Sequence, residues 1–223
     1  PTPAPAPTPT PTPAPAAAAA APTPAVTTLD NAPMKGPYAD LAKLCADTAA
    51  ITGNETKCSA RGATPIALAA PFVAGVMLDA TVRDEGGDCI FAIQVARGWY
   101  ATGWACSDPM VGESTRLDGI VVDDAIAGGD KEAVASFTHE GHLDDGGAAY
   151  RTQQLRVCVA RGEAAPVCTE AVDTGGTLTP DGGSEQPWKT KRTATSDGFA
   201  LAADGVIPEA FTGVVQRYVV ELD

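Results

Sequence analysis

The sequence has 223 residues, of which 15 are Lys or Arg and 28 are Asp or Glu, so its formal net charge is −13. This length suffices for one well-buried domain, or at most for two small ones. The acidic balance disfavours nucleic acid and anionic membranes as partners, and no apolar run is long enough to span a bilayer.

The first 25 residues contain only Pro, Thr and Ala. Alternating proline fixes φ and disfavours helix in each preceding residue, which favours polyproline II. The segment offers no apolar face to bury, so it cannot fold by itself. We therefore expect residues 1–29 to form a Pro-rich arm or linker, with threonines suited to O-linked sugar. Because the chain starts at Pro1 without methionine, we expect a processed product.

This composition resembles the Pro-Thr linkers of secreted bacterial enzymes and surface proteins. It also resembles the hydroxyproline-rich segments of extracellular glycoproteins in walled eukaryotes. The resemblance covers about a tenth of the chain. It implies a tether outside the cell and names no family.

Residues 30–64 are expected to hold a short helix and a disulfide-closed loop that lead into the main domain. Leu41, Leu44 and Cys45 recur at helical spacing, which predicts a helix within residues 38–50. The sequon at Asn54 is a site for N-linked glycan only in a eukaryotic secretory path.

From residue 65 to 223 the apolar pattern changes to a period of two, which indicates β-strands. Acidic, glycine-rich turns separate many of the strands and supply the positive φ angles of tight connections. About ten strands with hairpin spacing predict an all-β, antiparallel sandwich of jelly-roll-like type. The expected strands are 76–83, 89–97, 99–106, 116–123, 132–143, 148–160, 166–173, 188–195, 198–203 and 211–222.

Six cysteines in an even, widely spaced set predict disulfides and an oxidising compartment. If Arg97 and Gly98 form a two-residue hairpin loop, Cys89 lies directly opposite Cys106. A loop centred on Glu163 places Cys158 opposite Cys168, which leaves Cys45 for Cys58. Each bridge closes a loop of roughly 10–18 residues, worth about 3 kcal/mol in the chain-entropy model. Free, buried cysteines in a cytosolic protein are the alternative.

The stretch Thr138-His139-Glu140-Gly141-His142 contains both histidines of the chain. Zinc proteases use His-Glu-x-x-His on a helix, whereas here the spacing is i, i+3 on a predicted strand. Alternation places His139 toward the apolar face, with Phe137, and His142 away from it. A metal site of His139, Glu140 and His142 would need a further ligand, such as Asp144 or Asp145.

Aromatic side chains offer a second kind of site, because glycan-binding modules stack sugars on exposed rings. Under the expected register Tyr100 and Trp104 lie on the core face, while Trp99 points away from it. Trp99 and Trp188 are therefore the candidates for a ligand-binding platform. Core positions for both rings are the alternative.

No nucleophile motif, phosphate-binding loop or paired-carboxylate arrangement accompanies these features. We therefore expect a non-enzymatic, extracellular structural protein without a cofactor, built as a disulfide-stapled β-domain on a Pro-rich arm. Its role would be that of a subunit of a surface appendage or filament, or of a displayed adhesin. The expected partners are further copies of the chain, other surface components or glycans. The alternatives are a secreted carbohydrate-binding module and a metal-dependent hydrolase.

Overall fold

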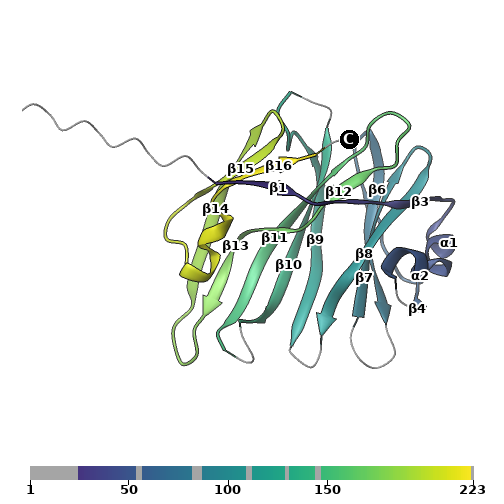
Figure 1. The fold of residues 1–223 in the computed structure, drawn as a ribbon. Helices are drawn as coiled ribbons and strands as arrows, with labels where there is room; N and C mark the ends of the chain where they lie inside the picture. Colours follow the sequence, from purple (N-terminus) through teal and green to yellow (C-terminus); the bar gives the residue numbers. More distant parts are fainter. Residues whose placement is uncertain are drawn as a thin grey trace, which may run out of the picture.

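Hairpin-connected antiparallel strands make up most of the molecule, and the computed structural model describes residues 25–53, 57–81, 87–108, 112–128, 131–143 and 147–221. The fold is an all-β, sandwich-like arrangement with a few short helices, as the sequence predicts (Figure 1). The strands are β1 Val26–Leu29, β2 Asn31–Pro33, β3 Lys35–Tyr38, β4 Lys57–Cys58, β5 Ile66–Ala67, β6 Phe72–Thr81, β7 Gly87–Val95, β8 Gly98–Asp108, β9 Glu113–Asp123, β10 Glu132–His142, β11 Ala149–Val159, β12 Val167–Thr169, β13 Val172–Thr179, β14 Gln186–Thr195, β15 Gly198–Ala203 and β16 Arg217–Val220. The helices are α1 Leu41–Ala46, α2 Thr48–Thr52 and the 3₁₀ helix η1 Glu209–Val214.

The strand order is that of a meander. Along the main path the order is β1-β16-β15-β14-β13-β11-β10-β9-β8-β7-β6-β4, so most strands pair with their neighbours in sequence. A jelly roll needs Greek-key connections, so this finer part of the prediction is wrong. Short, glycine-rich turns favour hairpins between consecutive strands, and hairpins produce a meander.

Strand β14 belongs to two sheets. Its first residues, through Lys189, pair with β13, while Thr190 to Thr195 pair with β15. The sheet of β1, β14, β15 and β16 thereby packs over β10 and β11. Apolar side chains fill the space between them, including Phe199, Tyr218, Leu155 and Val157.

A second core lies between the β6–β8 group and the β9–β11 group. Strands β8 and β9 pair only at one end, through residues 107–108 and 113–114. Figure 1 shows the two strands meeting at that end and diverging from it. Phe91 and Phe137 fill the opening edge to face, with ring centroids 5.6 Å apart, and Trp104 contacts Phe137 in the same geometry at 5.8 Å.

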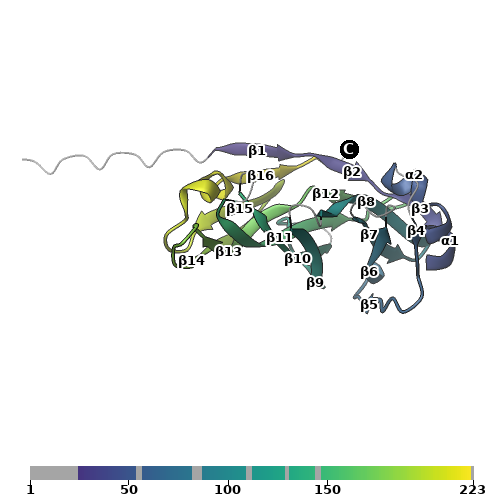
Figure 2. The ribbon, with the colours of Figure 1, turned by 90° about the horizontal axis from the view of Figure 1, so that it is seen from below.

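Residues 26–38 form a strap across the molecule, which we define as strands β1, β2 and β3. β1 pairs with β16 in parallel, β2 pairs with β12, and β3 pairs with β8. In both views the strap crosses one face of the sheets (Figures 1 and 2). Leu29 is 2% exposed, so the predicted arm boundary at residue 29 is wrong: Val26–Leu29 belong to the folded domain.

The other element predictions need smaller corrections. The helix expected over residues 38–50 is divided into two short helices, because Asp47 ends α1 and precedes α2. Asp40 caps the start of α1, where its Oδ1 accepts a hydrogen bond from Lys43 N at 2.8 Å. The strand expected over 211–222 begins only at Arg217, because η1 precedes it. Strands β1 to β5 were not expected, since each has four residues or fewer and shows no alternation.

The register of the β7–β8 hairpin differs from the predicted one by two residues. The loop is Ala96-Arg97, Val95 pairs with Gly98, and Cys89 pairs with Trp104. Gly98 has φ 134°, and a Cβ there would lie 2.7 Å from the carbonyl oxygen of Tyr38. The close approach of β3 therefore leaves room only for glycine at this position. From the turn to the pair Asp88–Ala105, a shift of two residues keeps the side chains on their predicted faces.

Arg97 connects this hairpin to the turn between β11 and β12. Its guanidinium donates to the backbone carbonyls of Glu163 and Ala164 in the β11–β12 turn. Two turns that are distant in sequence are thereby joined through one side chain.

Candidate functional site

The three predicted disulfides are confirmed. Cys45–Cys58, Cys89–Cys106 and Cys158–Cys168 have Cα–Cα distances of 5.0, 5.4 and 4.1 Å. Cys158 and Cys168 are directly opposed, as expected. Cys106, however, is the residue that the register skips between the pairs Gly87–Ser107 and Asp88–Ala105, so a bulge brings it to Cys89. Three disulfides indicate an oxidising compartment.

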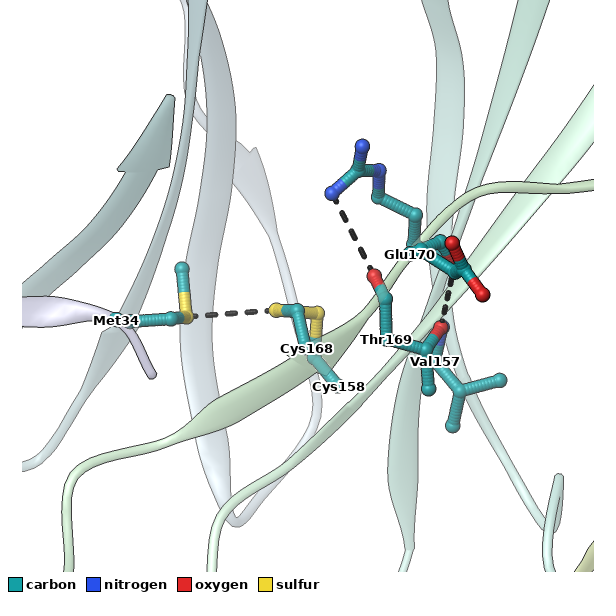
Figure 3. The surroundings of a disulfide bond; sticks show 7 residues. Met34, Val157, Cys158, Cys168, Thr169 and Glu170 are labelled. Carbon is teal, nitrogen blue, oxygen red and sulfur yellow. Dashed lines mark hydrogen bonds between the residues drawn. A yellow bond between two sulfur atoms is a disulfide. The ribbon is translucent and has the colours of Figure 1, made fainter. Parts of the chain in front are cut away.

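The Cys158–Cys168 bridge also anchors the strap (Figure 3). Met34 points toward it, with its sulfur 3.4 Å from Cys168 Sγ, and is 3% exposed. Beside the bridge, Thr169 Oγ1 accepts from the amide of Val157 at 3.1 Å and donates to the carbonyl of Glu170 at 2.8 Å. The strap is therefore fixed at its centre by side-chain packing as well as by backbone pairing.

The two histidines lie on opposite faces of β10, as alternation predicts. His139 is half-buried: Nδ1 lies 3.0 Å from Thr115 Oγ1, and Nε2 lies 2.9 Å from Tyr150 Oη. His142 is exposed, and Glu140 forms an ion pair with Arg151 at 2.7 Å. The residues His139, Glu140 and His142 therefore do not converge on one point.

In the part of the chain that the structure describes, no three His, Cys, Asp or Glu side chains lie close enough together to bind a metal ion. Asp144, Asp145 and Asn54 lie outside the described residues.

Gly141, between Glu140 and His142, is needed because the Tyr150 side chain occupies the space beside it. A Cβ at this position would lie 2.7 Å from Tyr150 Oη and 2.9 Å from its Cζ. The missing side chain leaves the space in which the Tyr150 hydroxyl reaches His139. The motif thus has a structural explanation as a hydrogen-bonded chain from Thr115 through His139 to Tyr150.

Both tryptophans proposed as a ligand platform are buried, so the expectation of exposed rings is wrong. Trp99 is 6% exposed because α1 and α2 cover its face of the sheet with Leu44 and Ile51. Trp188 is 4% exposed because η1 covers it, and its ring stacks on Phe211 with centroids 4.7 Å apart. The predicted core position of Tyr100 is confirmed.

A polar groove lies over β9, β10, β11 and β13. Cross-strand pairing aligns its residues in rows: Arg116, Thr138 and Gln153 form one, and Glu140, Arg151 and Thr177 form the next. Ala149 connects His142 and Thr179 in a third row. Two adjoining depressions of about 610 and 380 Å³ share Arg151 and Thr177, and these we call together the groove. The lining residues outside the rows are Gly112, Asp118, Gly141, Tyr150, Gly176, Glu185 and Trp188.

Ion pairs and hydrogen bonds hold the polar groups of the groove in place. Arg116 contacts Asp118 at 3.0 Å, and Thr138 Oγ1 donates to Asp118 Oδ2 at 2.6 Å. At one end, burial raises the pKa of Tyr150, and the nearby carboxylate of Glu113 adds to this effect. The groove therefore presents hydrogen-bond donors and acceptors side by side, with positive and negative groups alternating.

Of the residues that line the groove, the sequence pointed only to Glu140, His142 and Trp188. In the sequence the groove appears only as polar residues at every second position, Thr138-x-Glu140 and Arg151-x-Gln153. The same alternation is found in any sheet face that is exposed to solvent. Comparison of the chain with protein-family models, curated proteins and solved structures found no match. Among the helices of the described residues, none is long and apolar enough to cross a membrane.

Proposed function

We propose that the chain is a non-enzymatic extracellular protein that displays a disulfide-stapled β-domain at the cell surface on a Pro-rich arm. It serves as a subunit of a surface appendage or filament, or as a displayed adhesin. Its partners are further copies of itself or other surface components. The three disulfides and the polyproline composition of the arm support this location.

The observation that carries the proposal is the strap. The segment that directly follows the arm pairs with three strands distant in sequence, β16, β12 and β8. Such pairing joins the arm to the domain far more firmly than a flexible linker would, because pulling on the arm loads several strand pairs and the packing of Met34. A connection of this kind suits a domain held under tension at a surface.

Strand β1 supplies a surface for assembly. Among the described strands it ends the main path of the sheet, so one edge of β1 offers its backbone groups for pairing. Val26 on this strand is 57% exposed. Addition of a strand from a second copy at this edge is the simplest route to a polymer.

Immunolabelling of intact cells tests the location. Antibody against the folded domain is expected to label unpermeabilised cells, and brief protease treatment of intact cells is expected to remove the label. Label that appears only after permeabilisation would overturn the proposal.

Electron microscopy of native material then separates a polymer from an isolated adhesin. A polymer built through β1 is expected to disappear in Thr28→Lys, because a lysine on an edge strand opposes strand addition. Ser136→Lys is the matched control, since Ser136 is exposed on β10 and pairs on both sides, with Gly119 of β9 and Leu155 of β11. Filaments that persist in Thr28→Lys would exclude the β1 edge, and single particles in the parent would favour the adhesin.

The metal-dependent hydrolase is less well supported, because both ring nitrogens of His139 already have partners in Thr115 and Tyr150. The carbohydrate-binding alternative loses Trp99 and Trp188 as its platform, but the groove offers it a different surface.

A further inference from the structure

We propose that the groove over β9–β13 is a binding site for a neutral oligosaccharide, held through hydrogen bonds rather than by stacking on aromatic rings. This inference deepens the proposed function and rests on the location of the domain outside the cell.

The dimensions of the groove fit an extended ligand. Along β10 its rows run from Thr138 to His142, roughly 13 Å at the usual rise of a strand. Across the sheet it covers four strands, or roughly 14 Å at the usual strand spacing. The two depressions adjoin at Arg151 and Thr177, which line both, so an extended ligand that spans them would contact both residues.

The polar groups of the groove match sugar hydroxyls. A hydroxyl donates one hydrogen bond and accepts others, so it needs donors and acceptors side by side. Arg116 and Arg151 are donors, Asp118 and Glu140 are acceptors, and the Gln153 amide is both. Their mutual contacts at 3.0 and 2.7 Å place a donor and an acceptor side by side at each of these two points.

Other ligand classes fit this surface less well. Anionic ligands meet the carboxylates of Asp118, Glu140 and Glu185 on a chain of net charge −13. Cations meet the two arginines. An amphipathic helix needs apolar pockets, whereas the one tryptophan in the lining, Trp188, is almost fully buried.

Binding to immobilised glycans, followed by calorimetry on the best neutral oligosaccharide, tests the proposal on the full chain. Arg151→Ala and Gln153→Ala are each expected to weaken binding about tenfold or more, because each removes hydrogen bonds to the ligand. Lys131→Ala is the matched control: it also breaks an exposed ion pair, with Asp124, but outside the groove. Its affinity is expected to equal that of the parent.

Binding is further expected to change little with salt, since neither partner relies on net charge. Absence of binding to any neutral glycan would overturn the inference, as would binding that Arg151→Ala and Gln153→Ala leave unchanged. Strict dependence on an acidic glycan and on low salt would also overturn it. Surface labelling of intact cells is independent of these results, so a groove without ligand leaves the location and assembly of the domain unaffected.

Discussion

Individual residues explain the features that first suggest chemistry in this chain. In Thr138-His139-Glu140-Gly141-His142, His139 bonds Thr115 and Tyr150, Glu140 pairs with Arg151, and Gly141 makes room for Tyr150. The sequence predicts that the histidines diverge, because side chains of a strand alternate. It does not show the hydrogen-bond partners of His139, which come from β9 and β11.

Gly141→Ala tests this explanation. The new methyl group would overlap the Tyr150 hydroxyl, so we expect a loss of about 1–3 kcal/mol in the free energy of unfolding in urea. Gly119→Ala is the control, because no atom of the described residues would lie within 4 Å of a Cβ at this position, which is also in a strand. Equal effects of the two substitutions would contradict the role assigned to Gly141.

Glu132 predicts a pH dependence of stability. Its side chain is fully buried, Oε2 accepts from the amides of Ala125 and Ile126 at 3.0 and 3.2 Å, and Oε1 has no hydrogen-bond partner among the described residues. Burial raises the pKa of Glu132 above its ordinary value of 4.5. The pKa of Glu132 is therefore higher in the folded chain than in the unfolded chain, and between these two values the folded chain binds the proton more tightly. As the pH rises through that range, this carboxyl lowers the stability of the fold.

Glu132→Gln removes the buried charge and keeps an oxygen for both amides. Relative to the parent, the variant is expected to gain stability progressively as pH rises above about 4.5 and through the folded pKa. Chemical unfolding at a series of pH values measures the difference. Glu185→Gln, on an exposed side chain, should show no such trend. A constant difference at every pH would exclude Glu132 as the titrating group.

At the scale of elements, the strap connects parts of the fold that hairpins alone leave separate. It pairs with β16, β12 and β8, and Met34 packs into the core between the β6–β8 and β9–β11 groups. Met34→Ala is expected to destabilise the domain by about 2–5 kcal/mol in thermal or urea unfolding. Val26→Ala on the same strap, at an exposed position, should stay within about 0.5 kcal/mol of the parent. A Met34 effect as small as the Val26 effect would show that the strap contributes little to stability.

At the scale of the whole molecule, the disulfides differ in their access to solvent. Cys45 and Cys58 are half-buried near α1, whereas the other four cysteines are buried. Since exchange needs access of a thiolate to the sulfur, mild reductant is expected to open Cys45–Cys58 first. Alkylation and peptide mass mapping over time give the order. Earlier opening of Cys158–Cys168 would contradict the burial order of the three bridges.

Local rules in the sequence determined much of this fold. Alternation over long strands located β6 to β11, β14 and β15 closely, and glycine-rich turns located the hairpins between them. The disulfide pairs followed from the same reasoning, since each bridge joins segments that are close in sequence. The pair Cys89–Cys106 was right although the β7–β8 register was wrong by two residues, because a bulge at Cys106 brings this residue to Cys89.

Only the tertiary structure decided which faces are covered. The alternation of side chains along a strand shows that Trp99 and Tyr100 point in opposite directions. It does not show that α1 and α2 cover Trp99. Strands β1 to β5 are too short to show a period, so the strap became visible only through its pairing with β16, β12 and β8. The groove likewise depends on four strands placed side by side, because its rows join residues that are almost forty positions apart, such as Arg116 with Gln153 and Glu140 with Thr177. The sequence thus determined the local hairpins and disulfides of this protein, while long-range packing decided its strap, its buried tryptophans and its groove.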